Sequence, residues 1–76
     1  MTSKLTLARK AAGFTSAESL ATKVGVSAYY LHEIERGAAR PSGRLAGRLA
    51  TQLHLTAEEV IVLSRLAQRA LRRRLG

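Results

Sequence analysis

Few side chains in this chain can perform acid–base, nucleophilic or metal chemistry. The 76 residues include five acidic residues, two histidines and no cysteine. Without cysteine there are no disulfides and no zinc–thiolate sites, and His32 and His54 are not spaced as a metal motif. The carboxylates that are close in sequence are explained by helix position and capping: Glu33 with Glu35, and Glu58 with Glu59. We therefore expect no enzymatic activity, no catalytic residue, no metal and no cofactor.

The positive charge of the sequence says more about its function than its few reactive side chains do. Thirteen lysines and arginines give a net charge of +8 and an isoelectric point near 11.4. After Glu35 the only acids are Glu58 and Glu59, whereas this half contains nine arginines: Arg36, Arg40, Arg44, Arg48, Arg65, Arg69, Arg72, Arg73 and Arg74. A positive electrostatic field of this strength around a small protein favours polyanionic partners. Solvated basic faces also occur without such a partner, so charge alone leaves both interpretations open.

Length and hydropathy narrow the class of protein further. A chain of this size predicts one domain over 1–76, without a separate domain for a small-molecule ligand. No apolar run approaches the ~18 residues of a membrane span. The N-terminal residues have no continuous apolar stretch behind their charge, so we expect no secretory signal and a cytoplasmic protein.

Capping residues and glycines divide the first half of the chain into three predicted helices. The first, roughly 4–12, is capped by Ser3 and ends at Gly13. A capping box of Thr15 and Glu18 begins the second, roughly 16–24. Gly25 ends that helix, and Ser27 caps the third, roughly 28–36, which stops at Gly37. The apolar positions at helical spacing are expected to face the core: Leu5, Ala8, Ala12, Leu20, Ala21, Val24, Leu31 and Ile34.

Two further helices are predicted in the second half. Ser42 caps a fourth helix of about eleven residues, and a second capping box, Thr56 with Glu59, opens a fifth over about 57–74. The core stripe of the fourth helix consists of Leu45, Ala46, Leu49 and Leu53. Because no strand-like alternation occurs, we expect an all-α fold, a compact five-helix bundle with an extended C-terminal helix.

Short motifs follow one another in a fixed order between Leu5 and about Val62. They are Arg9 with Gly13, Glu18-Ser19-Leu20-Ala21, Val24-Gly25-Val26-Ser27, Leu31, Ile34-Glu35-Arg36-Gly37 and Arg40-Pro41-Ser42. With this order and spacing the segment resembles the phage-repressor and Cro-like (XRE-type) family of helix-turn-helix domains. One extra residue lies between Gly13 and Leu20. Ser16-Ala17 replaces the glutamine common near the second helix's start, so the phosphate contact of that glutamine is not carried over.

The resemblance implies a sequence-specific transcription regulator of double-stranded DNA in the nucleoid, with repression favoured over activation. The helix-turn-helix would span about 16–36, and helix 28–36 would enter the major groove. With its apolar residues turned inward, four side chains remain for base contacts: Ala28, Tyr29, His32 and Glu33. None of the four is Arg, Lys, Asn or Gln. We therefore expect specificity to depend on DNA shape and apolar contacts more than is usual.

Phosphate contacts are expected at helix N-termini, which present free N–H groups and a partial positive charge. The candidate residues at these ends are Ser16, Ala17, Ser27, Ser42 and Gly43, and the flanking arginines are Arg36, Arg40 and Arg44. Arg48 lies one turn further along and is expected to be solvated. Tyr30 is left with two interpretations, packing against neighbouring helices or contacting DNA.

Arg9 and Glu35 occupy positions that commonly pair across the first and third helices of the family the chain resembles. An acid in an element that faces DNA makes little electrostatic sense unless a cation neutralises it. The resemblance therefore implies an interhelical ion pair, at least partly buried, with a structural role for Glu35.

The fifth helix carries two apolar strips. One is suited to packing on its own domain: Val60, Leu63, Ala67, Ala70 and Leu71. Val62 and Leu66 form the other, bordered by arginines. A helix with two apolar faces usually has two partners, so we predict that Val62 and Leu66 meet their equivalents in a homodimer. The alternative is that Val62 belongs to the core and the arginine-rich end is solvated or touches DNA.

Two other classes of protein fit parts of the sequence. A membrane-surface peptide would suit the basic, amphipathic C-terminal segment, but this segment lacks Trp and Phe anchors and four capped helices precede it. An antitoxin-type or other protein-interaction module, with a protein as its main partner and DNA binding secondary, overlaps with the regulator interpretation and is kept as the alternative. No membrane partner is expected.

Overall fold

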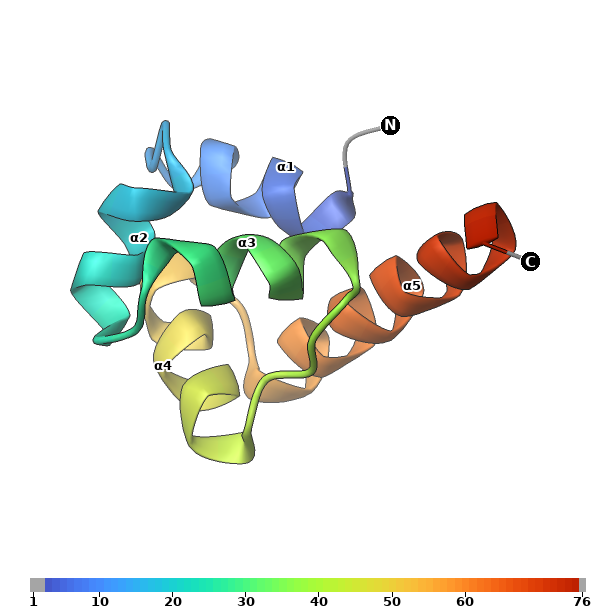
Figure 1. Cartoon of the computed structure of the whole chain (residues 1–76). Helices are drawn as coiled ribbons and strands as arrows, with labels where there is room; N and C mark the ends of the chain where they lie inside the picture. The colour runs from blue at the N-terminus through green and yellow to red at the C-terminus, as the bar shows by residue number, and fades with distance from the viewer. Residues whose placement is uncertain (1–2, 76) are drawn as a thin grey trace.

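The computed structural model describes residues 3–75, and this part of the chain folds into an all-α bundle (Figure 1). Its helices are α1 (Lys4–Ala11), α2 (Ala17–Val24), α3 (Ala28–Arg36), α4 (Gly43–Leu53) and α5 (Ala57–Leu75). Each expected helix is present, so the predicted fold class is confirmed. The expected domain, 1–76, also includes residues 1, 2 and 76, which lie outside the described residues.

Serine side chains begin the first four helices. Ser3, Ser16, Ser27 and Ser42 have extended backbones, and each Oγ accepts a hydrogen bond from the backbone N–H three residues on. Each bond satisfies a donor that has no carbonyl partner in the first turn. The predicted capping box of Thr15 and Glu18 is wrong by one residue, because Ser16 caps α2 and its partner is the N–H of Ser19 (3.1 Å).

The capping box at the start of α5 is present as predicted. The backbone N–H of Thr56 donates to Glu59 Oε1, and the N–H of Glu59 donates to Thr56 Oγ1, each at 3.0 Å. The preceding helix, α4, is followed by the C-cap residue His54, whose φ of 59° is left-handed. Histidine is among the non-glycine residues that tolerate this conformation best, and the N–H of His54 bonds to the carbonyl of Ala50.

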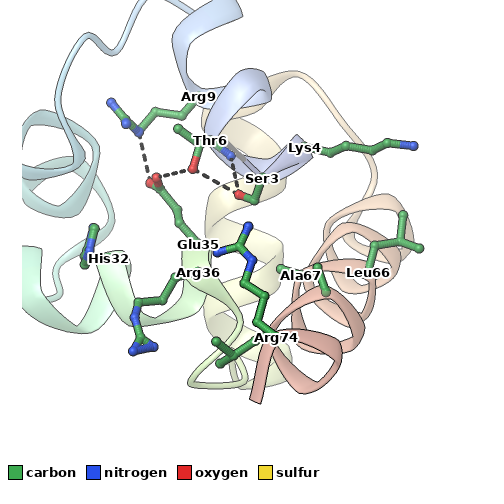
Figure 2. A pocket seen from close by; sticks show the side chains of 12 residues that line it. Ser3, Lys4, Thr6, Arg9, His32, Glu35, Arg36, Leu66, Ala67 and Arg74 are labelled. Carbon is green, nitrogen blue, oxygen red and sulfur yellow. Dashed lines mark hydrogen bonds and ion pairs between the residues drawn. The ribbon is translucent and has the colours of Figure 1, made fainter. Parts of the chain in front are cut away.

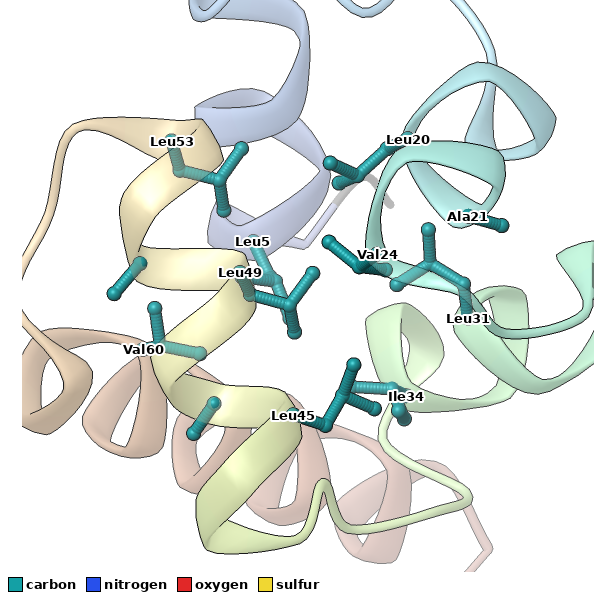
Figure 3. Close-up of a cluster of buried hydrophobic side chains, with 12 residues drawn as sticks. Leu5, Leu20, Ala21, Val24, Leu31, Ile34, Leu45, Leu49, Leu53 and Val60 are labelled. Atoms are coloured by element: carbon teal, nitrogen blue, oxygen red, sulfur yellow. The ribbon is translucent and has the colours of Figure 1, made fainter.

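The core lies where the apolar stripes of all five helices meet (Figure 3). Its buried members are Leu5, Leu20, Ala21, Val24, Leu31, Ile34, Leu45, Ala46, Leu49, Ala50, Leu53 and Val60. Ala8 and Ala12 are partly buried against this cluster. Removal of this apolar surface from water is the main driving force that holds the helices together.

The inward face of α5 differs in part from the prediction. Val60 and Ala67 are buried and Leu63 and Leu71 are half-buried, but Ala70 is exposed. Ser64, which the predicted strip did not include, also lies inward: it is 2% exposed, and its hydroxyl has no hydrogen-bond partner among the described residues. A polar residue in this position cannot be identified by hydrophobic periodicity.

Helix α5 packs against α4, α1 and α3, and its C-terminal turns extend beyond the rest of the bundle (Figure 1). A close approach occurs at Gly37, directly after α3, where a Cβ would lie 2.3 Å from the backbone oxygen of Ala67. Only a residue without a side chain fits there. The end of α3 is thereby held against the middle of α5. Among residues 3–75, no helix is long and apolar enough to cross a membrane.

Candidate nucleic-acid interface

Helices α2 and α3 form a compact two-helix unit joined by a tight turn. Gly25 adopts a left-handed φ of 78°, and its N–H and that of Val26 both bond to the carbonyl of Ala21. Ser27 then begins α3 directly. The short turn and the buried residues of both helices fix the angle at which α3 is presented, as in a helix-turn-helix unit.

Arg48 of α4 helps to close this unit, which the sequence did not predict. Its Nη1 donates to the carbonyl of Val24 at the end of α2 (3.3 Å). Arg48 is exposed, as expected, but it also makes this contact with the backbone, so it is not only solvated. A cation at a helix C-terminus satisfies a free carbonyl and interacts favourably with the helix dipole, and the periodicity of α4 alone contains no information about this contact.

The outward face of α3 is centred on Tyr29, His32 and Arg36, all of which are exposed. Tyr29 retains 75% of its accessible surface although it is a large aromatic residue. Ala28 and Glu33 were expected to be free but are half-buried: Ala28 packs against the core, and Glu33 Oε1 lies 3.5 Å from Arg36 Nε in an ion pair. They lie at the edges of the exposed face.

Of the two interpretations of Tyr30, packing against neighbouring helices is the one that the structure shows. Its ring is partly buried against the core, and its hydroxyl donates to the carbonyl of Arg40 (3.2 Å). A buried aromatic ring with its polar tip on a backbone carbonyl is a stable arrangement. Tyr30 therefore ties the loop after α3 to the helix and positions the residues that follow it.

The predicted phosphate anchors lie mainly on the surface. Ser16, Ser27, Arg36, Arg40, Ser42, Gly43 and Arg44 are exposed, whereas Ala17 is half-buried and packs against the core. Each serine hydroxyl accepts the N–H at the third helical position, so the first two N–H groups of each helix remain directed outward. Arg65 of α5 lines the same small pocket as Arg40, and the sequence did not predict that these two arginines lie near each other.

The ion pair expected between Arg9 and Glu35 is present behind α3 (Figure 2). Arg9 Nε donates to Glu35 Oε2 (2.9 Å), and the two side chains are 8% and 5% exposed. Thr6 Oγ1 donates to Glu35 Oε1 (2.8 Å), and Arg9 Nη1 donates to the carbonyl of Phe14 (2.9 Å). Both carboxylate oxygens are therefore occupied, which offsets the cost of burying the charge. The contribution of Thr6 has no sequence signal.

A pocket of about 460 Å³ opens beside this ion pair, between α1, α3 and α5. Figure 2 shows His32 and Arg36 on one side of it and Leu66 and Ala67 on the other. Lys4 also lines the pocket. The basic surface of α3 is thus continuous with an apolar strip of α5.

The comparisons with known proteins point in the same direction as this geometry. The model of a helix-turn-helix domain family matches residues 2–63. The chain belongs to this helix-turn-helix domain family. The match is consistent with the XRE-type resemblance and covers α1 to α4 with the first part of α5. No curated protein and no solved structure matched the chain at a significant level.

Apart from Leu75 at the end of α5, three large apolar side chains of α1 and α5 are exposed among the described residues. Val62 is 45% exposed and Leu66 38% exposed, on the side of α5 opposite Val60 and Ala67. Leu7 of α1, at 54%, lies across an open groove from Val62. The interpretation of Val62 as a core residue is therefore wrong, and Leu7 is an additional surface residue that the sequence analysis did not select.

Proposed function

We propose that this helix-turn-helix protein is a sequence-specific transcription regulator that binds double-stranded DNA through α3, and that it acts as a repressor. The observation that carries the proposal is the exposed face of Tyr29, His32 and Arg36. These residues stand on a helix whose opposite side is fixed by the core and by the Arg9–Glu35 pair. A rigid helix with a polar and aromatic outer face fits the major groove.

Base contacts and phosphate contacts are assigned to different residues. Tyr29 and His32 are the base readers, since they lie on the outer face of α3 within its first turns. Ala28 and Glu33 flank them and contribute base contacts at the edges of the exposed face of α3. Arg40 and Arg44, with the N–H groups of α4 beside Ser42, contact the backbone. Arg36, at the end of α3, contacts the adjacent phosphate.

The assignment is tested by binding of full-length variants to duplexes over a range of salt concentrations. Arg44→Ala should weaken binding to all sequences alike and lower the salt slope by about one unit, because one phosphate contact is lost. Tyr29→Ala should instead alter the preferred base at one position by ~1–3 kcal/mol. Selection of bound sites from a random duplex pool provides the reference ranking. An unchanged ranking for Tyr29→Ala would refute the orientation of α3.

The regulator is proposed to bind as a homodimer through α5. A two-fold partner would allow two α3 helices to read an inverted repeat about 34 Å apart, one turn of duplex. Val62 and Leu66 support this proposal, since both are apolar and exposed on a face that no other helix of the described chain covers.

Leu66→Glu is the direct test of the dimer. We expect a folded protein whose light-scattering mass falls to that of a monomer, because the introduced charge would be buried without a partner in the interface. Leu75→Glu is a matched control, since Leu75 is 80% exposed at the end of α5, and it should leave the mass unchanged. A Leu66→Glu variant that remains dimeric would rule out this interface.

A further inference from the structure

The face of α5 that points away from the core has a regular heptad spacing. Glu59, Val62, Leu66, Arg69 and Arg73 follow one another at alternating intervals of three and four residues, and all five are exposed. This spacing places side chains in one line along a helix, as at the contact positions of paired helices. The line lies opposite the buried residues Val60, Ser64 and Ala67.

Charge is strongly asymmetric along this line. It begins with an acid, has two apolar residues in the middle, and ends with two arginines. One carboxylate oxygen of Glu59 accepts the capping N–H of Thr56, and no hydrogen bond or ion pair from residues 3–75 occupies the other. Within residues 3–75, Arg69 and Arg73 take part in no hydrogen bond or ion pair. These charges are therefore available to a partner.

The asymmetry distinguishes between the two ways in which the helix can pair with a second copy. In a parallel pair Glu59 would face Glu59 and Arg69 would face Arg69, which is repulsive at both ends. In an antiparallel pair with Val62 opposite Leu66 of the partner, Glu59 lies opposite Arg69, because each is three residues further out. A two-fold axis generates the same contact twice.

We propose that the occupant of this face is a second copy of the chain, and that the two α5 helices pair antiparallel with Glu59 of each copy against Arg69 of the other. The inference rests on the proposed dimer and gives it a direction and a register. It also explains how a chain with a net charge of +8 can self-associate, since two of its five acids lie at the N-terminal end of this helix.

The surface beside α5 enlarges the contact that the helix pair can make. The open groove between α1 and α5, about 720 Å³, is lined by Leu7, Leu55 and Val62. Lys4, Glu58 and Glu59 also line it. Partner side chains that enter this groove would bury additional apolar area, which a single helix pair needs in order to reach the size of a stable interface.

Charge reversal on the full-length chain tests the register. Glu59→Lys and Arg69→Glu should each raise the dimer dissociation constant about tenfold or more at low salt, because each change creates two repulsive pairs per dimer. The double variant should return to within about threefold of the wild type, since both attractive pairs are restored with reversed sign. Sedimentation equilibrium at two salt concentrations measures the constants, and high salt should reduce the differences.

Arg72→Glu is the matched control, because Arg72 is exposed on α5 but lies off the heptad line. It should stay within about threefold of the wild type. Single variants that dimerise like the wild type would indicate a parallel or different contact. A double variant that is no better than the single ones would indicate that the charges serve only the helix dipole. Either result, or a monomeric wild type at high concentration, would overturn the inference.

Duplex binding by the same variants separates this inference from the proposed function. A wild-type monomer that binds a single half-site with a steep salt dependence retains the DNA-binding proposal and refutes the pairing. A dimer with the expected rescue that binds no duplex refutes the DNA-binding proposal and supports the pairing. Helix content by circular dichroism identifies any variant that fails to fold, and mixing folded Glu59→Lys with folded Arg69→Glu should restore dimers.

Discussion

Replacement of Glu35 by alanine is expected to lower the free energy of unfolding by about 3–5 kcal/mol, because it leaves the buried Arg9 guanidinium without its counter-charge. Glu35 and Arg9 are only 5% and 8% exposed, and Thr6 also loses its acceptor. Among the described residues, Arg9 would keep only its bond to the carbonyl of Phe14. Urea denaturation followed by circular dichroism measures the change.

The same chain contains an exposed pair that serves as the control. Glu33 and Arg36 are separated by 3.5 Å, but their side chains are 22% and 46% exposed. Glu33→Ala should therefore change the stability by about 1 kcal/mol or less. If Glu35→Ala cost no more than Glu33→Ala, the Arg9–Glu35 pair would have to be exposed in solution, contrary to the structure.

The second large effect is expected at Gly37, where two constraints coincide. Its φ of 91° is unfavourable for any residue with a side chain, and an added Cβ would lie 2.3 Å from the Ala67 oxygen and 2.7 Å from the Gln68 nitrogen. The clash involves backbone atoms, so it can be relieved only by moving α5 away from α3. We expect Gly37→Ala to destabilise the protein by ~2–4 kcal/mol in thermal or urea unfolding.

A variant of Gly13 separates the cost of the steric clash from the cost of the left-handed backbone conformation. Its φ of 95° is similar, but an added Cβ would meet nothing within 4 Å. Gly13→Ala should therefore cost only the conformational strain, about 1 kcal/mol. Equal losses for the two variants would show that the close approach of Gly37 to Ala67 contributes nothing to stability. A larger loss at Gly37 measures the contact that holds α5 against the end of α3.

Local signals in the sequence were sufficient for the helices and for most of the core. Ser3, Ser27 and Ser42 mark helix starts because their hydroxyls bond to an N–H only three residues away. Such a contact depends on neighbouring residues alone. The same locality limits precision, since Thr15 and Ser16 carry equivalent hydroxyls and only the folded backbone selects Ser16. Apolar stripes also predicted the inward side of α4 except for Ala50, which is buried as well, because helical periodicity is a property of one segment.

The surroundings of the candidate site depended on residues far apart in the chain. Arg48 reaches the end of α2 across 24 residues, and Thr6 reaches Glu35 across 29. Neither contact leaves a pattern in its own helix, so sequence periodicity could not reveal it. The pair of Arg9 and Glu35 was anticipated only through the family resemblance, which already contains information about tertiary structure.

The sequence by itself determined a basic, all-α chain with a helix-turn-helix pattern, because charge and periodicity are properties of segments. Tertiary packing decided which outward residues of α3 stay free: it covered part of Ala28 and Glu33 and left Tyr29 exposed. It also decided the position of α5, through the contact of Gly37 with Ala67. The physical reason is that burial and steric fit are set by whichever helix lies opposite, and that neighbour is chosen only when the whole chain folds.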